Sequence, residues 1–156
     1  MNPEWVRERC LAFPGATEHV IWGTDLTFKV AGKIFAHLVL DPAPVWLSFK
    51  TTPEKFYELT EQPNIIPAPY MARAQYIALQ SRDALAAEEL AALLRESYEL
   101  VVAKLPKKTR EAVSRGVAVR VPTQKQSPAK SAAGKKRPAK KSVHKQRIGK
   151  KKKSGG

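Results

Sequence analysis

Clusters of lysine and arginine near the C-terminus are the residues whose type and spacing most clearly point to chemistry. They are Lys135, Lys136, Arg137, Lys140, Lys141, Lys150, Lys151, Lys152 and Lys153. Basic chains bind nucleic acids because each neutralised phosphate releases condensed counterions. No aromatic residue follows Tyr98, so this segment has no side chain on which unpaired bases could stack. We therefore expect it to contact the backbone of double-stranded DNA, with RNA as the alternative.

The charge of the chain is concentrated in that segment. The 156 residues carry 28 basic and 14 acidic side chains, a formal net charge of +14. Residues 1–122 hold 15 of the basic and all of the acidic residues, a net charge of +1. Residues 123–156 hold the other 13 basic residues and have few large apolar side chains, so we expect them to be disordered. A solubilising or import role would be the simpler explanation, but 13 cations exceed what import needs.

Several classes of protein are excluded by the remaining composition. No apolar run is long enough to insert into a membrane. The first ten residues contain Glu4 and Glu8 and no apolar core of a secretory signal. A single cysteine, Cys10, cannot form an internal disulfide. We therefore expect a cytoplasmic protein, associated with the nucleoid if it is bacterial.

The first 122 residues offer weaker candidates for nucleic-acid contacts. Lys29 and Lys33 flank a predicted hairpin turn, and Lys50 ends the next predicted strand. Each of these three lysines could contact a phosphate or simply face solvent. Lys104, Lys107, Lys108 and Arg110 form a basic end to the last long helix. Cations at that end also complement the helix dipole, which would by itself explain them.

Catalytic and metal-binding candidates are poor, so we expect neither an enzyme nor a cofactor or metal. His19, His37 and His144 lack the spacing of metal ligands, and Cys10 lies on a helix face typical of a small core residue. Glu18 and His19 near Asp25 could be drawn as an acid–base cluster, but no pocket motif accompanies them. Glu4 and Glu8 alternate with arginines, which cancels an acidic iron-binding face. The three tryptophans are expected to pack in or around the core, with a binding role open to Trp46 if it is exposed.

The elements that must position these residues follow from hydrophobic periodicity. Asn2-Pro3 is typical of a helix start, which predicts a helix to about Phe13. Alternating residues predict a hairpin over 26–40 around Ala31-Gly32, whose turn type stays open, and strands over 45–49 and 75–80. A short helix is predicted from Pro53 to before Pro63, a long one over 87–105, and an extra turn or helix over 107–113. The apolar face predicted for the long helix comprises Leu90, Leu93, Leu94, Ser97, Tyr98, Val101 and Leu105.

This order of elements predicts an α+β fold, an antiparallel sheet with helices packed on one face. The sequence divides into a folded domain over 1–113, a linker over 114–122 and the basic tail over 123–156. Valines alternate at 117, 119 and 121 as in an edge strand, but an extended linker is our interpretation.

Five segments resemble the MmcQ/YjbR family, in the same order over residues 1–113. They are Cys10–Glu18 (CLAFPGATE), Trp22-Gly23, Thr27–Ala36 (TFKVAGKIFA), Pro69–Tyr76 (PYMARAQY) and Ser97–Lys108 (SYELVVAKLPKK). The resemblance implies a frataxin-like sandwich with a double-wing element described as DNA-binding, and no established catalytic site. Relatives often carry His and Trp where this chain has Ala74, Gln75 and Tyr76, and the tail lies outside the family domain.

Together these features predict a non-enzymatic, mainly sequence-independent DNA-binding protein whose tail supplies most phosphate contacts. The alternative is a protein- or ligand-binding module whose tail only localises it on RNA, ribosomes or an acidic surface. The sequence leaves the oligomeric state open.

Overall fold

The computed structural model describes residues 1–41 and 44–117, all of which fall in a single unit. The basic tail, most of the predicted linker and the two valines at 119 and 121 lie outside the described residues. Four helices are present: α1 (Pro3–Leu11), α2 (Pro53–Thr60), α3 (Ala87–Ala103) and α4 (Lys107–Ser114). Six strands accompany them: β1 (Ala16–Ile21), β2 (Asp25–Val30), β3 (Lys33–Val39), β4 (Leu47–Lys50), β5 (Ile65–Pro67) and β6 (Tyr76–Leu79). A single-turn 3₁₀ helix, η1 (Ala72–Ala74), precedes β6.

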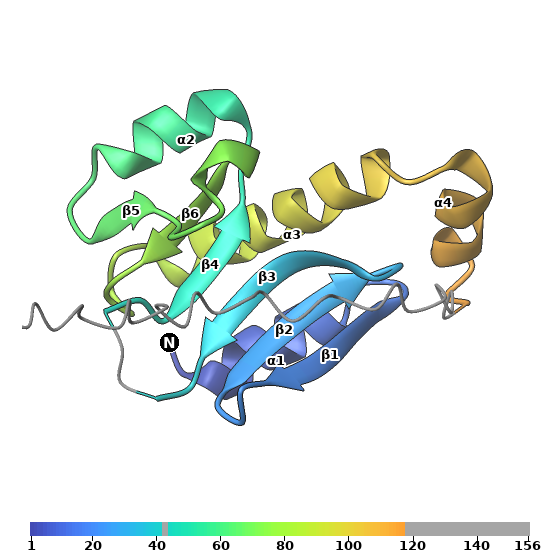
Figure 1. The fold of residues 1–156 in the computed structure, drawn as a ribbon, viewed down its shortest axis with the longest axis horizontal. Coiled ribbons are helices and arrows are strands. Elements are labelled where there is room, and N and C mark those ends of the chain that lie inside the picture. The colour runs from blue at the N-terminus through green and yellow to red at the C-terminus, as the bar shows by residue number, and fades with distance from the viewer. Residues whose placement is uncertain (42–43, 118–156) are drawn as a thin grey trace, which may run out of the picture. The chain divides into compact units, whose positions relative to one another are not determined.

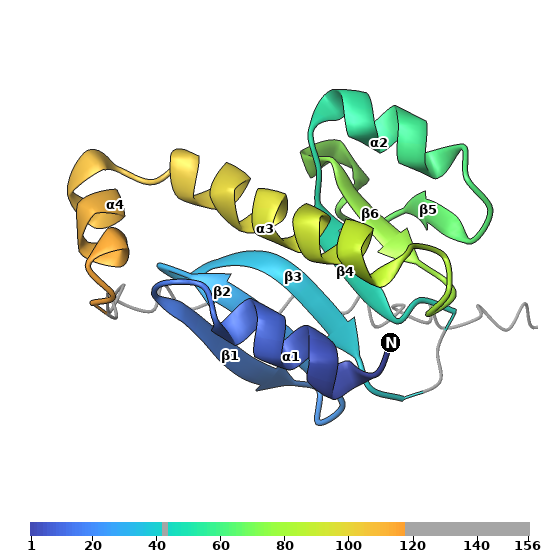
Figure 2. The same cartoon turned by 180° about the vertical axis from the view of Figure 1, so that it is seen from behind.

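The six strands form one antiparallel sheet in the order β1-β2-β3-β4-β6-β5. Helices α1 and α3 run across one face of it, as Figures 1 and 2 show from opposite sides. Leu59 of α2 is buried in the same cluster as α1 and α3, so α2 covers this face as well. The predicted α+β fold is thereby confirmed. None of the helices in the described residues is long and apolar enough to cross a membrane.

Two strands differ from the sequence-based expectation, because β1 and β5 were not predicted. Both lie at the edges of the sheet, where one side of a strand has no partner; no residue of β1 is buried, and β5 has only three residues. In β5, Pro67 lacks a backbone N–H, which an edge strand tolerates because no ladder bond is needed there.

The core lies between the sheet and the helices. All seven residues of the apolar face predicted for the long helix are buried, Ser97 among them, although α3 ends at Ala103 and Leu105 follows it. Val6 and Cys10 of α1 are also buried, while Trp5 and Phe13 are partly buried against the same cluster. The predicted inward face of α1 is confirmed, although the helix ends two residues earlier than expected.

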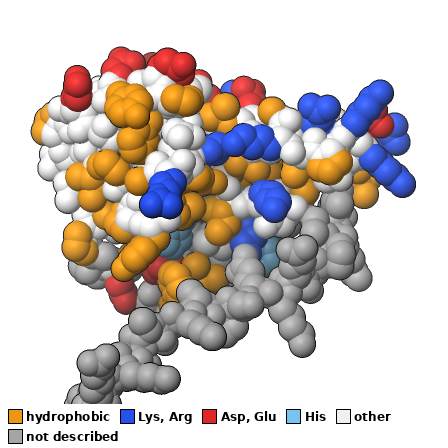
Figure 3. Space-filling model, turned by 45° about the horizontal axis from the view of Figure 1, so that its top comes forward, with side chains coloured by type: hydrophobic (Ala, Val, Ile, Leu, Met, Phe, Trp, Pro, Cys, Tyr) orange, Lys and Arg blue, Asp and Glu red, His pale blue; other side chains and the backbone are white. Residues whose placement is uncertain are grey.

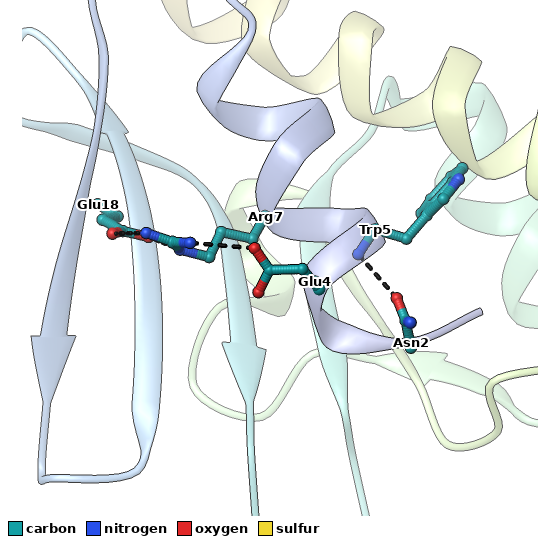
Figure 4. Close-up of polar contacts among 5 residues, drawn as sticks. All are labelled: Asn2, Glu4, Trp5, Arg7 and Glu18. Carbon is teal, nitrogen blue, oxygen red and sulfur yellow. Dashed lines mark hydrogen bonds and ion pairs between the residues drawn. The ribbon is translucent and has the colours of Figure 1, made fainter.

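Helix α1 is fixed at its start and along its outer side. Asn2 accepts a hydrogen bond from the Trp5 N–H at 2.8 Å, which caps the helix and leaves Pro3 in the first turn. One turn later Arg7 reaches Glu18 on β1 through two hydrogen bonds of 2.6 Å, and Glu4 through one of 3.1 Å (Figure 4). The ion pair with Glu18 ties α1 to the edge strand of the sheet.

Strands β3 and β4 separate beyond a short paired stretch, and α3 fills the opening. They pair where Ala36–Leu38 faces Leu47–Phe49, and one further hydrogen bond of 2.8 Å runs from Val39 N to Trp46 O. The Ser97 hydroxyl on α3 then accepts a hydrogen bond from Lys50 N at 2.8 Å and donates one to Phe35 O at 2.5 Å. The buried backbone groups that would otherwise lack a partner are thus satisfied by a helix side chain.

Candidate nucleic-acid interface

The turn between β2 and β3 holds two of the predicted contact lysines. Lys33 pairs with Val30, and Ala31 and Gly32 have φ angles of 47° and 75°. Positive φ at both central residues is the pattern of a type I′ turn, whose twist matches that of the strands. Lys33 is exposed and Lys29 is half-buried beside it, so the turn presents cations at one end of the sheet.

Helix α4 brings further cations to the same end. Val113 of α4 is buried, and its side chain faces Gly15, where an added Cβ would lie 3.4 Å from Val113 Cγ1. Gly15 precedes Ala16, which pairs with Val30 next to the β2–β3 turn. Figure 1 accordingly shows α4 and the β2–β3 turn at the same end of the molecule. Three predicted cations lie on α4 with exposed side chains, namely Lys107, Lys108 and Arg110.

Lys50 does not face solvent, unlike the solvent-facing strand residue that the sequence suggested. It is only 6% exposed, its amine donates a hydrogen bond to Ala74 O, and it lies 5.2 Å from the centre of the Tyr76 ring. Burial and the neighbouring Lys104 ammonium hold its pKa below the ordinary value for lysine. Lys50 is therefore a largely enclosed group and not an exposed cation at the end of a strand.

Acidic side chains gather elsewhere in the described domain. Helix α2 carries Glu54 and Glu58, Glu61 caps its C-terminal end, and the first turn of α3 carries Glu88 and Glu89. In Figure 3, Lys and Arg side chains occupy mainly the middle and the α4 side of the face, while most Asp and Glu lie along its upper edge. A body with nearly zero net charge thus has one strongly basic end.

The acid–base cluster drawn from the sequence does not assemble. Glu18 points to α1, where hydrogen bonds from Arg7 hold its pKa below the usual range. His19 is the next residue along β1 and therefore faces the opposite side of the sheet, where its Nε2 lies 3.2 Å from the Thr17 hydroxyl. Asp25 instead approaches His37, with 3.1 Å between Oδ2 and Nε2.

The remaining chemical candidates are accounted for by packing. Cys10 is fully buried, and burial raises its pKa to about 12, so its thiol stays protonated at neutral pH. Among residues 1–41 and 44–117, no three His, Cys, Asp or Glu side chains are grouped so as to hold a metal ion. His144 lies outside these ranges. Trp46 is buried and donates to Ser81 O at 2.8 Å, as expected for a packing residue.

Sequence reasoning misjudged Trp22 and missed the role of Tyr76. Trp22 is 81% exposed on the β1–β2 loop, with a φ of 50°, so the expectation that it packs around the core was wrong. Because this loop joins the other end of β2, Trp22 lies away from the basic end.

Tyr76 is buried, and its side chain extends past β4 to donate a hydrogen bond to Ile34 O at 2.6 Å. No local signal indicates such a contact, which joins residues 42 positions apart.

Comparison with known proteins places the domain in a family. The YjbR family model matches residues 11–100. A solved structure of protein DR2400 from Deinococcus radiodurans, described as a DUF419 domain, superposes with a TM-score of 0.64 at 28% identity, covering 70% of this chain and 85% of that one. A solved structure of a Pseudomonas syringae protein shares the fold with a TM-score of 0.56 at 22% identity, covering 64% of this chain and 98% of that one. No curated protein matches this chain.

Proposed function

The chain belongs to the YjbR family, and from this premise we propose that it is a non-enzymatic protein that binds double-stranded DNA largely independently of sequence. The supporting observation is that exposed cations gather at one end of a domain whose net charge is close to zero. A local positive surface attracts phosphates even when the whole domain is nearly neutral. The likeness to frataxin that the family resemblance implies stays a prediction.

The lysine-rich segment supplies the larger share of affinity in this proposal. In sequence it follows α4, the helix that carries Lys107, Lys108 and Arg110. Its 13 cations without an anion favour non-specific duplex binding, which is almost wholly electrostatic. The folded domain would add a weaker contact of defined shape through the β2–β3 turn and α4.

A binding series with full chain and truncated chain tests the proposal. Fluorescence anisotropy on duplex DNA, single-stranded DNA and RNA is measured between about 50 and 200 mM salt. Removing residues 123–156 should weaken duplex binding at least about a hundredfold at low salt. The slope of log K against log salt should become shallower by roughly 5 to 10 units. Failure of the full chain to bind duplex DNA below micromolar concentration would contradict the proposal and favour the binding-module alternative.

A pair of double variants tests the contribution of the folded domain. Replacing Lys107 and Lys108 with Ala should weaken duplex binding by about three- to tenfold and reduce the salt slope by about 1 to 2 units. The control replaces Lys55 and Arg82 with Ala. Lys55 already pairs with Glu96 at 2.9 Å. Arg82 lies beyond Leu79, the last residue of β6, and so at the end of that strand opposite to Tyr76. Equal losses in the two variants would show that the basic end has no special role.

A further inference from the structure

Three aromatic side chains in the described part of the chain are largely exposed, namely Trp22 (81%), Tyr57 (71%) and Tyr70 (107%). Such a ring can stack on a nucleic-acid base, provided that phosphates can approach it. Tyr57 lies on α2 with Glu54 and Glu58, whose carboxylates repel phosphates. Trp22 lies at the end of the sheet opposite to the β2–β3 turn. The surroundings of Tyr70 are more favourable.

The segment that carries Tyr70 is positively charged. Residues 62–82 contain no Asp or Glu, and Arg73 of η1 is an exposed cation three positions after Tyr70. Three residues span at most about 11 Å between their Cα atoms. The Tyr70 ring and the Arg73 guanidinium can therefore contact the base and a phosphate of the same stretch of nucleic acid.

Hydrogen bonds fix the loop of residues 68–75, which we call the Tyr70 loop. Ala68 N–H donates to Tyr76 O at 2.9 Å, which joins the two ends of the loop. The largely enclosed amine of Lys50 donates to Ala74 O within it. A ring on a loop held in this way loses little conformational entropy when it binds a ligand.

Tyr70 itself points out of the loop. Its neighbours Ala68 and Met71 pack into an apolar cluster with Tyr76, whereas the Tyr70 side chain is fully exposed. Its φ angle is 65°, in the left-handed region that a bulky side chain rarely adopts. Such strained residues persist where the surrounding structure enforces them, and they are frequent at binding sites.

The Tyr70 loop adjoins the strand that begins at Lys33. Tyr76, the residue after the loop, donates from its hydroxyl to Ile34 O at 2.6 Å. Lys33 is exposed and immediately precedes Ile34. A nucleic acid that contacts Tyr70 can thus extend from the loop toward the cations of the β2–β3 turn.

We propose that the Tyr70 loop binds an unpaired base of DNA. The Tyr70 ring stacks on the base, and Arg73 contacts a phosphate beside it. Within a fully paired duplex the base faces are already stacked, so the loop favours DNA with a bulged base or a junction between single and double strands. The inference rests on the proposed function, because it takes DNA as the ligand of the basic end.

The affinity of the full chain for two matched DNA duplexes tests the loop. One is fully paired, and the other carries one extra, unpaired 2-aminopurine, whose fluorescence falls when it stacks. At about 150 mM salt the bulged duplex should bind at least about fivefold more tightly, with a fall in fluorescence. The basic tail meets phosphates in both duplexes, so its contribution cancels in the ratio of affinities. Equal affinities would overturn the inference and leave the proposed function standing.

Substitutions of Tyr70 separate the ring from the conformation of the loop. Tyr70→Ala should reduce the ratio of affinities to about 1 and change binding of the paired duplex less than about twofold. Tyr70→Gly should do the same, at a φ angle that glycine adopts freely. Tyr70→Phe keeps the ring and should keep the preference, as should the control Tyr57→Ala. A preference that persists in Tyr70→Ala and Tyr70→Gly would contradict the inference.

Two arginine variants test the phosphate contact beside the base. Arg73→Gln should weaken binding of the bulged duplex about three- to tenfold and lower its salt slope by about 1 unit. Arg82→Gln is the matched control, because both arginines are exposed but lie beyond opposite ends of β6. Equal losses in the two variants would overturn the role of Arg73.

The same titrations separate the loop from the proposed function. Binding of the bulged duplex alone, with loss in Tyr70→Ala, would support the Tyr70 loop and overturn sequence-independent duplex binding. Failure to bind either DNA would overturn the proposed function and, with it, the inference that rests on it.

Discussion

Ser97 illustrates how one polar side chain supports the opening in which Lys50 lies. It is fully buried on α3, where a serine would otherwise be unfavourable, and it satisfies one N–H of β4 and one C=O of β3. The same hydroxyl therefore holds the two strands at the separation that α3 requires. A buried polar residue in an apolar helix face is here a structural link between sheet and helix.

Replacing Ser97 with Ala should destabilise the protein by about 2–4 kcal/mol, because two buried backbone groups lose their partner. Urea denaturation followed by circular dichroism measures the change. The matched control is Ser114→Ala on α4, whose hydroxyl bonds to Arg110 O at an exposed position. That variant should change the free energy of unfolding by less than about 0.5 kcal/mol. Similar losses in both would show that the bridge between β3 and β4 contributes nothing specific.

Glu18 should make the stability of the domain sensitive to acid. Hydrogen bonds from Arg7 lower its pKa in the folded state, so the stabilisation is present above the unfolded value of about 4.3 and is lost as pH falls through the folded pKa. Glu18→Gln should lower the melting temperature at pH 7 by about 2–5 °C, the modest effect expected of a partly exposed pair. The difference from the unsubstituted chain should vanish at the lowest pH. Thermal melts between pH 2 and 7 measure it, and a constant difference over that range would contradict the assignment.

At the scale of elements, a β-bulge changes which residues of β3 enter the core. The pairing register between β2 and β3 shifts between Phe28 and Lys29 of β2. As a result Phe35 of β3 is buried, although strict alternation would point its side chain outward. Phe35 then packs against Phe13 and Tyr98, with ring centres 6.0 and 5.5 Å away. Leu40 would share the buried side of Leu38 under strict alternation, but it lies beyond the end of β3 and is 42% exposed. The bulge thus brings Phe35 of β3 against Tyr98 of α3 and against Phe13, which follows α1.

Docking of α4 depends on Val113, the buried residue of that helix. Val113→Ala should lower the free energy of unfolding by about 1–3 kcal/mol and loosen α4, because it removes the apolar contact with Gly15. Hydrogen exchange of the α4 amides and urea denaturation provide the two measurements. Val117→Ala, at a residue that is 54% exposed, is the control and should leave both unchanged. Normal protection of α4 in Val113→Ala would show that another contact holds the helix.

At the scale of the whole molecule, folding and charge are carried by different parts of the sequence. Every buried apolar residue among those described lies between Val6 and Val113. Most of the excess positive charge follows Pro122. Stability and affinity for a polyanion should therefore respond separately to changes in the two regions.

A chain truncated to residues 1–122 should unfold in one cooperative transition, with a melting temperature within about 5 °C of that of the full chain. The reason is that the truncation removes no described core residue. Differential scanning calorimetry measures both chains at equal ionic strength. Loss of the cooperative transition would place the domain boundary beyond residue 122.

The sequence by itself determined the elements whose pattern is local. The apolar face of α3 follows from the helical spacing of its leucines, and the β2–β3 hairpin follows from alternation around Ala31-Gly32. The start of α1 follows from Asn2 and Pro3 because a cap involves neighbouring residues alone. These signals also sufficed to predict the α+β class and its antiparallel sheet.

Only the tertiary structure decided what depends on residues distant in the chain. Edge strands β1 and β5 form because a partner strand is available, which their own weak patterns do not show. Lys50 was expected to touch a phosphate or face solvent at a strand end, yet α3, η1 and Tyr76 enclose it. Charge and hydrophobic period can be recognised in the local sequence, whereas burial depends on how the sheet and the helices pack.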